Sequence, residues 1–525
     1  MKRKTLVLPA VAGLLAPVLA GCGAPDGGGT DTGPVVVGTT DRIAASTTDP
    51  APLDPATAHG PGARNVLRQT VQTLMATPRG GGAPVPDAAE NCRFTDSRSE
   101  SYRCRLRTGL TFADGTPVTP DDVAHSIDRV RRIGADGQPA ALLAGIDTVE
   151  TSGTRDIVFH LRTPDAAFPY KLATPAAGIV PRAHYPADAA RDGFRVDGSG
   201  PYTMKAEVRS GRLVKATFTR NPRYRGSHET HDDTVELDVF PDAAAMERAF
   251  DARRVDVMAH AMSTDRARRL LAEPEDGVRL TEMPGLAIGY LGFDTGAPAV
   301  RDRAVRRAVA RSVDRGRIAS RVRGGTVEPL YSPIPAGVTA HANAFYSAYG
   351  EPDTAGAAAL LKKAEVPTPV RFTLHYPDDR HGPETAAVFD AVAKQLNDTG
   401  LFDVTAQGVP PARFGPALLR GDYAVHGTVL VPEFPDPDAY TAPLLGPAAP
   451  PEARTLVDRS RRTADRAAAV PALERLQDVV ARDVPVLPLW QETRYTASLD
   501  GVGGVEWAVG PGTDLRLWEL RRGSA

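Results

Sequence analysis

Runs of apolar and β-branched residues alternate with helical segments along almost the whole chain. The first predicted strand is the apolar sequence VVVGT at 35–39, and a helix with regularly spaced apolar residues is predicted at 65–75. The alternation continues to about residue 487. Such alternation predicts layers of helices against sheets, and we therefore expect the α/β class with mixed sheets.

The other predicted elements follow from periodicity and from helix start signals. Thr119 is expected to cap a helix with Pro120 at its first position and acidic residues in its first turn. That helix and five others are predicted at 120–130, 243–250, 302–314, 354–363, 384–396 and 471–482. Strands are predicted at 91–94, 102–106, 147–150, 156–161, 213–219, 235–240, 255–258, 286–293 and 370–376.

The 525 residues exceed what one hydrophobic core normally organises, so two or three domains are expected. A content of 42% hydrophobic and 24% charged residues is typical of a soluble globular chain. The formal net charge is −2, and loss of the basic residues 2–4 with a signal segment would make it about −5. This balance argues against a nucleic-acid partner, which requires a basic face.

The N-terminus has the pattern of a secretory signal. Residues 2–4 (KRK) are basic, a mostly apolar stretch too short to span a bilayer follows, and two small residues precede Cys22. The sequence LAGC at 19–22 resembles a bacterial lipobox. The resemblance implies that 1–21 is a removed signal peptide and that Cys22 carries lipid, with 22–33 as a flexible tether. Ordinary secretion with a chance cysteine is the alternative.

The other two cysteines, Cys92 and Cys104, lie in two predicted strands on either side of a polar turn centred near Arg98. The two cysteines are equally far in sequence from the centre of that turn, so their side chains would lie opposite each other in the hairpin. An even number of cysteines in an exported chain favours a disulfide. Two free buried thiols are the alternative.

Sequence motifs of enzymes are missing. There is no HExxH zinc helix, no GxSxG nucleophile elbow and no phosphate-binding P-loop. The sequence HETHDD at 228–233 could form a surface metal site, but we interpret it as a solvated loop, and the Arg-rich segment 301–311 as a solvated helix face. His125 is interpreted as structural. We therefore predict no catalytic residue, no metal site and no cofactor.

Seven short motifs occur in order along the chain. They are LDP at 53–55, LRTGLTFADGTPVTPDDV at 106–123, GSGPY at 198–202, RNPRY at 220–224, YLGFDT at 290–295, VRRAVA with DR at 305–315, and FPDPD at 434–438. Together they resemble family 5 of the bacterial extracellular solute-binding proteins, the peptide and nickel binders of ABC importers. Most of these residues have turn chemistry, so they indicate the fold and do not identify a ligand.

The resemblance implies a two-lobed periplasmic-binding-protein-like fold of class II, with three domains of which one is discontinuous. Domain I would comprise 34–58, 178–275 and 488–525. Domain II would be 59–177 and domain III 276–487. Ligand would close the lobes by hinge motion.

The resemblance also places two segments at the cleft. In the loop after LDP, residues His59, Gly60 and Pro61 occupy positions that touch peptide in oligopeptide binders; a plain Gly/Pro loop is the alternative. In the segment before DPD, the GWxxDY positions are held by Val429, Leu430, Glu433 and Phe434. Glu433 replaces the acid that pairs with a peptide's α-ammonium group, whereas the Trp is absent. Glu433 could instead point into solvent.

The function implied is that of a lipid-anchored binding subunit that captures peptides or peptide-like solutes and delivers them to an ABC permease with separate ATPase subunits. It would lie on the outer face of the cytoplasmic membrane, in the periplasmic space or on the cell surface. Alternatives within the fold are another cargo, such as a metal chelate, siderophore or oligosaccharide, or a surface sensor for a signalling peptide.

Overall fold

The computed structural model of the chain describes residues 33–523 except 48, 59, 135–137, 260–261, 379–383 and 446–448. The predicted signal peptide, nearly all of the predicted tether, Cys22 and His59 therefore lie outside the described residues.

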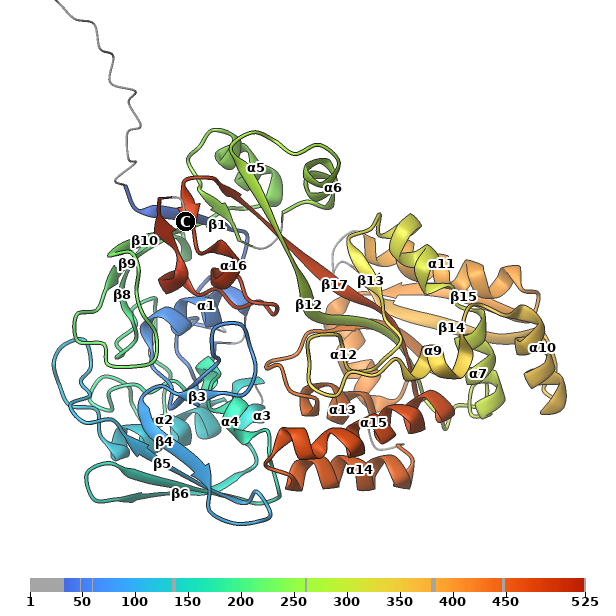
Figure 1. Cartoon of the computed structure of the whole chain (residues 1–525), viewed down its shortest axis with the longest axis horizontal. Helices are drawn as coiled ribbons and strands as arrows, with labels where there is room; N and C mark the ends of the chain where they lie inside the picture. The colour runs from blue at the N-terminus through green and yellow to red at the C-terminus, as the bar shows by residue number, and fades with distance from the viewer. Residues whose placement is uncertain are drawn as a thin grey trace, which may run out of the picture.

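Two halves of the molecule are joined by a pair of long strands that cross the gap between them (Figure 1). These strands are β12 (Val278–Phe293) and β17 (Val486–Leu499). We call residues 33–277 and 500–523 the N-lobe and residues 294–485 the C-lobe. Because the chain crosses once in each direction, the N-lobe contains both the start and the end of the described chain.

One mixed sheet of 11 described strands runs through both lobes. β12 and β17 pair antiparallel at its centre, and parallel pairs occur on either side. The expected mixed α/β class is therefore confirmed. The strands lie in the order β15 (Phe402–Val409), β14 (Val370–Pro377), β16 (Val425–Leu430), β12, β17, β11 (Val257–Met258), β1 (Val35–Thr39), β10 (Thr234–Val239), β9 (Arg212–Arg220) and β8 (Tyr202–Arg209), with β13 (Val327–Pro329) beside β17.

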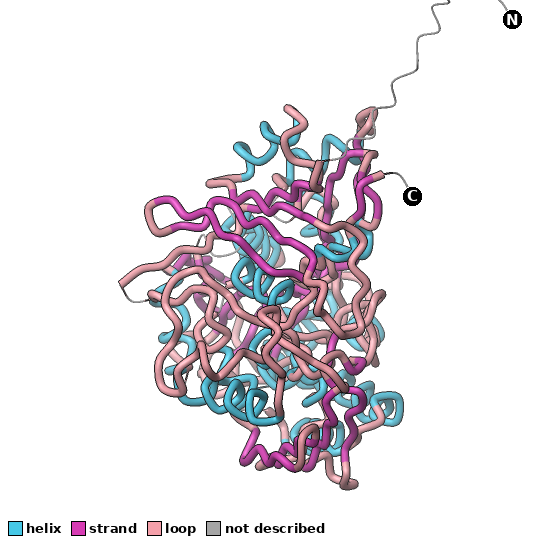
Figure 2. The backbone as a smooth tube through the Cα atoms, turned by 90° about the vertical axis from the view of Figure 1, so that its left-hand side faces the viewer, coloured by secondary structure: helices cyan, strands magenta, loops and turns pink. Residues whose placement is uncertain are grey.

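The N-lobe contains a second, four-stranded antiparallel sheet with the order β4 (Ala89–Phe94), β5 (Ser101–Leu106), β7 (Asp156–Leu161) and β6 (Ile146–Ser152). In the side view, strands gather near the top and the bottom of the molecule, with helices and long loops between (Figure 2). The helices of this lobe are α1 (Pro61–Thr70), α2 (Pro120–Ile133), α3 (Gln138–Leu143), α4 (Phe168–Lys171), α5 (Ala243–Asp251), α6 (Thr264–Ala272) and α16 (Val505–Ala508), with 3₁₀ turns at Pro175–Ala177 and Leu517–Glu519 and short strands β2 (Met75–Ala76), β3 (Val85–Pro86), β18 (Val502–Gly503) and β19 (Arg521–Arg522).

The C-lobe packs its helices around β14, β15 and β16. They are α7 (Arg303–Ser312), α8 (Arg315–Arg317), a π-helical turn (Ile318–Val322), α9 (Ala344–Tyr349), α10 (Thr354–Lys363), α11 (Glu384–Asp398), α12 (Pro411–Arg420), α13 (Asp438–Leu445), α14 (Pro451–Arg462) and α15 (Arg466–Asp483). Three large apolar clusters result: one in the C-lobe, one on the N-lobe part of the main sheet, and one on the four-stranded sheet. The residue boundaries of the three expected domains stay a prediction.

The predicted hairpin and its disulfide are confirmed. Cys92 in β4 lies directly opposite Cys104 in β5, and the two sulfur atoms are bonded at 1.98 Å. The predicted start of α2 is confirmed as well. The Thr119 hydroxyl accepts from the backbone N–H of Asp122, whose carboxylate accepts from the N–H of Thr119, a complete capping box.

Other predicted boundaries are wrong. The helix expected at 65–75 is α1, which begins four residues earlier because Pro61 is set for the first helical position, and ends when Val71 becomes extended. The strand expected from 286 begins at Val278, before a register shift that follows Pro284. The helix expected from 471 starts at 466, where the Asp465 side chain caps it.

The interpretation of 301–311 as a solvated face is wrong for Arg306. This side chain is 5% exposed and donates to the carbonyl of Asp483 through Nε at 3.1 Å and Nη2 at 2.9 Å. Asp483 is the last residue of α15, where carbonyls have no partner within the helix. Arg306 therefore caps a neighbouring helix instead of facing water.

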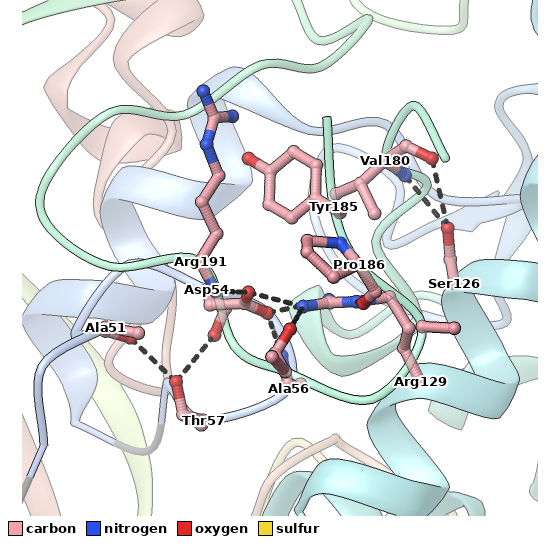
Figure 3. Close-up of polar contacts among 12 residues, drawn as sticks. Ala51, Asp54, Ala56, Thr57, Ser126, Arg129, Val180, Tyr185, Pro186 and Arg191 are labelled. Atoms are coloured by element: carbon pink, nitrogen blue, oxygen red, sulfur yellow. Dashed lines mark hydrogen bonds and ion pairs between the residues drawn. The ribbon is translucent and has the colours of Figure 1, made fainter. Parts of the chain in front are cut away.

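A buried ion pair holds the loop before α1 in place (Figure 3). The Asp54 carboxylate accepts from Arg129 Nη1 at 2.9 Å and Nη2 at 2.7 Å, and the two side chains are 0% and 1% exposed. Asp54 also accepts from the backbone N–H groups of Ala56 and Arg191. Both charges are thus fully hydrogen-bonded, as burial of an ion pair requires.

Arg129 extends the same network to the loop after the four-stranded sheet. Its Nε donates to the carbonyl of Pro186 at 2.6 Å and its Nη2 to that of Ala189 at 2.8 Å. The guanidinium also lies 5.3 Å from the ring centroid of Tyr185. One arginine of α2 therefore connects three separate segments of the N-lobe.

We predict that Asp54→Asn, which keeps the shape but removes the charge, destabilises the folded chain by about 3–5 kcal/mol, since it leaves the Arg129 cation buried without a counter-charge. The measurement is the urea midpoint of the N-lobe transition. Asp188→Asn, at an exposed aspartate of the contacting loop, is the control. Equal midpoints for the two variants would contradict the prediction.

Candidate functional site

The two lobes meet at an ion pair that contains Glu433. The strand β16 ends at Leu430, and the chain then turns toward the N-lobe. Both carboxylate oxygens of Glu433 lie 2.7 Å from Nη1 of Arg64, on α1. The side chains of Arg64 and Glu433 are 17% and 15% exposed. Glu433 therefore lies between the lobes, and its charge is matched there by the opposite lobe.

Phe434, the next residue, makes an apolar contact across the same boundary. It is 7% exposed and packs against Ala167 and Tyr170 of the N-lobe, with the two rings 6.2 Å apart. An aromatic side chain held in this way stabilises the approach of the lobes.

Val429 and Leu430 are the last residues of β16 and lie opposite Gly289 and Ile288 of β12. Both are half-buried and pack against the C-lobe core. They occupy the edge of that core, beside the segment that carries Glu433. The backbone of Gly289 runs so close to Trp490 that a Cβ there would lie 2.1 Å from the indole ring, and the glycine therefore permits this packing.

Gly60 and Pro61 form the N-terminal end of α1. Gly60 is the N-cap residue in an extended conformation, and Pro61 occupies the first turn. Open space lies beside Gly60, since a Cβ built there meets nothing within 4 Å. Both residues lie one turn before Arg64 on the same helix, so α1 brings this loop and Glu433 to one place. His59 lies outside the described residues.

A second group of charges lies on β17, where the strand passes between the lobes. Burial lowers the pKa of the Arg494 guanidinium, and nearby carboxylates act in the opposite direction. These carboxylates belong to Glu492, Asp41 and Asp514. Asp514 also accepts from Arg68 Nη2 at 2.6 Å. Arg494 thus lies near one acid of its own strand, Glu492, and two acids of the N-lobe, Asp41 and Asp514.

The outer rim of the boundary is closed by backbone contacts with the end of α14. The N–H of Ala166 donates to the carbonyl of Arg461 at 2.8 Å, and the Ser99 hydroxyl donates to that of Arg462 at 3.2 Å. Beside them, burial raises the pKa of Asp165, and the neighbouring Lys171 ammonium opposes this shift. The lobes therefore touch at the rim as well as at Glu433.

Arg64, Tyr170 and Arg494 were not predicted from the sequence. A predicted helix that begins at Pro61 would have pointed to Arg64, because Arg64 follows Pro61 by three residues and lies on the same face of the helix. Tyr170 and Arg494 belong to no recognised sequence motif. Phe434, the partner of Tyr170, and Asp41, which lies near Arg494, are distant from them in sequence.

Among the described residues, no group of three or more His, Cys, Asp and Glu side chains is arranged to hold a metal ion. The interpretation of 228–233 as a solvated loop is wrong for His228, whose ring stacks on Trp518 with centroids 4.2 Å apart. His125 donates through Nε2 to the carbonyl of Tyr185, 2.8 Å away, in agreement with a structural role. Within the described part of the chain, no helix combines the length and apolarity needed to cross a membrane.

The family model described as "Bacterial extracellular solute-binding proteins, family 5 Middle" matches residues 83–451. The Probable D,D-dipeptide-binding periplasmic protein DdpA of Escherichia coli strain K12 is 27% identical over 399 residues, which cover 74% of each chain. The Peptide transport periplasmic protein SapA of Salmonella typhimurium is 24% identical over 455 residues, 79% of each chain. These relatives are named as binding or transport proteins.

Solved structures agree on the fold. The structure titled "Clavulanic acid biosynthesis oligopeptide binding protein 2" superposes with a TM-score of 0.79 at 22% identity, covering 94% of this chain and 95% of that one. The unliganded open form of the periplasmic murein tripeptide binding protein MppA gives 0.77 at 21% identity, covering 93% and 97%. The match of the family model, together with this fold, shows that the chain belongs to family 5 of the bacterial extracellular solute-binding proteins.

Proposed function

We propose that the chain captures peptides or peptide-like solutes between its lobes and delivers them to the permease of an ABC importer. Several relatives are named for peptides or dipeptides, which supports this class of cargo. The observation that carries the proposal is the position of Glu433, a partly buried carboxylate between two lobes that β12 and β17 connect. Hinge motion about those strands would enclose a ligand beside this acid.

In this proposal, Glu433 pairs with a cationic group of the ligand, most simply a free α-amine. A carboxylate has room for several donors, so Arg64 and a ligand ammonium can share it. Gly60 and Pro61, at the start of α1, would border the same ligand, together with His59. Val429 and Leu430 would form its apolar wall, and Phe434 would contribute through its contact with the N-lobe. A cationic group of the ligand would add a further charge-assisted hydrogen bond to this carboxylate.

We propose the domain boundaries that the family resemblance implies: domain I at 34–58, 178–275 and 488–525, domain II at 59–177 and domain III at 276–487. The apolar cluster of the four-stranded sheet supports a separate domain II, since its members run from Ala56 to Ile179. The closed lobes would together form the surface that docks on the permease. Affinity for ligand would then depend on differential binding to the closed form.

Replacement of Glu433 tests the ligand contact. We predict that Glu433→Gln weakens binding of the native ligand, identified by mass spectrometry after denaturing release, by at least about tenfold, because the ligand cation loses its partner. Arg64→Gln is the matched control, since it breaks the same interlobe ion pair and leaves the acid in place. Isothermal titration of ligand-stripped protein gives both affinities.

If the ion pair serves only lobe closure, both variants should lose affinity equally, which would contradict the proposed contact. The ligand itself provides an independent check. A ligand whose α-amine is acetylated should bind Glu433→Gln and the unsubstituted protein with similar, weak affinity. Tight binding of the blocked ligand to the unsubstituted protein would exclude an amine as the recognised group.

We further propose that Cys22 anchors the mature chain to the outer face of the cytoplasmic membrane through lipid. We predict that Cys22→Ser moves the protein from the membrane fraction to the soluble fraction. The serine hydroxyl cannot form the thioether bond to the lipid, and without acyl chains the protein binds the membrane only weakly. Immunoblots of fractionated cells measure this. Retention of the variant on membranes would rule the anchor out.

A further inference from the structure

The C-terminal end of α14 lies against the N-lobe, at the lower end of the boundary in Figure 1. The last four carbonyls of an α-helix have no partner within the helix. In α14 they belong to residues 459–462. The C-lobe itself supplies donors to the first two of these carbonyls. The Thr463 hydroxyl donates to the carbonyl of Arg459 at 2.8 Å, and the Thr463 N–H donates to that of Ser460 at 3.2 Å.

The N-lobe supplies the donors for the other two carbonyls. The backbone N–H of Ala166 donates to the carbonyl of Arg461 at 2.8 Å, and the Ser99 hydroxyl donates to that of Arg462 at 3.2 Å. Ala166 and Ser99 are 2% and 1% exposed, so both donors are buried where the lobes touch. The cap of a C-lobe helix is therefore completed by the opposite lobe, and separation of the lobes would break it.

The two donors belong to one connected unit within the N-lobe. The N–H of Asp165 donates to the carbonyl of Ser99 at 3.0 Å. The Asp165 carboxylate accepts from the N–H of Ala167 at 3.1 Å and from Lys171 Nζ at 2.6 Å. Asp165 thus connects the turn that carries Ser99 to the loop that carries Ala166.

Ser99 is presented to α14 by a hairpin that a disulfide closes. It lies in the turn between β4 and β5, the two strands that the bond between Cys92 and Cys104 connects. Within this turn, the Asp96 carboxylate accepts from the N–H of Arg98 at 2.6 Å. These bonds hold the turn from within the N-lobe, so the position of the Ser99 hydroxyl does not depend on the C-lobe.

Charges on the two sides of this contact attract each other as well. Arg461 Nε donates to Asp438 of its own lobe at 2.7 Å. Burial acts to lower the pKa of the Arg461 guanidinium, but the carboxylates of Asp438 and, across the boundary, Asp165 raise it overall. Asp165 and Asp438 repel each other, and Lys171 and Arg461 offset this repulsion. Attraction between Arg461 and Asp165 therefore adds to the two hydrogen bonds.

We infer that Ser99 and Ala166, with the carbonyls of Arg461 and Arg462, form a latch that holds the lobes together without touching the ligand. None of these residues is among the proposed ligand contacts. The inference rests on the proposed function in one respect, because the latch affects affinity only if the ligand binds between the lobes. A molecule that opens then loses two hydrogen bonds, so the latch strengthens binding of any enclosed ligand by the same factor.

Hydrogen exchange of the Ala166 amide reports directly on the latch. It is measured on the ligand-stripped full chain by mass spectrometry with residue-resolved fragmentation. Ser99→Ala deletes one donor, and we expect Ala166 to exchange about threefold to tenfold faster, the effect of one lost hydrogen bond. Thr463→Val is the matched control, because it deletes a hydroxyl donor to the same helix end from within the C-lobe. It should leave the Ala166 rate unchanged.

Arg461→Gln is a second, independent variant. It removes the attraction to Asp165, and it should speed exchange at Ala166 but not at Ala167, whose N–H is bonded within the N-lobe. The latch would be overturned by an unchanged Ala166 rate in Ser99→Ala, by an equal rise in Thr463→Val, or by an equal rise at Ala167, which would indicate local unfolding of the loop.

A separate titration tests the link to affinity. The solute recovered by denaturing release should bind Ser99→Ala about threefold to tenfold more weakly than the unsubstituted protein. Faster exchange at Ala166 with unchanged affinity would support the latch and contradict binding between the lobes. Unchanged exchange would overturn the latch and leave the proposed function as it stands.

Discussion

The ion pair between Asp54 and Arg129 fixes the position of the segment on which the interlobe site depends. Asp54 is in the loop that leads directly into α1, and its carboxylate also binds the N–H of Ala56 within that loop. Ten residues later in the chain, in the first turn of α1, Arg64 pairs with Glu433. A charge pair at 0% and 1% exposure cannot exchange its partners for water without a large cost in free energy. The pair therefore fixes residues 54–56, ahead of the helix that holds Arg64 between the lobes.

The lobes differ from separate domains on a linker because a single sheet passes through both. β12 and β17 contribute strands to the C-lobe core at one end and pair with the N-lobe sheet through β11 at the other. Arg494 and Glu492 lie on this shared element, and Asp41 and Asp514 face Arg494 from the N-lobe. A charged ligand bound at the boundary would therefore interact electrostatically with the connecting strands as well as with the facing surfaces of the lobes.

The sequence was most informative where structure is set by neighbours in the chain. The capping box at Thr119 and Asp122, the helix at 354–363 and the pairing of Cys92 with Cys104 follow from local rules, and all are observed. Family motifs identified the mixed α/β fold for the same reason, since they consist mainly of turn residues.

Contacts between distant segments could not be predicted. Glu433 was expected near a ligand, but its partner Arg64 is on a helix whose start was misplaced. His228 looked like part of a polar loop because the ring that covers it, Trp518, comes from the end of the chain. Phe434 likewise meets Tyr170 only once both lobes are assembled. Such pairs depend on tertiary packing, which hydrophobic periodicity does not encode.

The paired strands β12 and β17 also have a mechanical consequence. A two-stranded antiparallel ribbon resists stretching along its length, because stretching breaks its ladder of hydrogen bonds, but it twists and bends easily. The ladder is irregular between Pro284 and Ile288 and again between Gly289 and Tyr290, next to the point where the strands enter the C-lobe. Deformation concentrates where a ladder is already interrupted. The proposed hinge motion would then be torsion between Pro284 and Ile288, before β13 and β16 join the ladder, and the stiffness of this short stretch would set its rate.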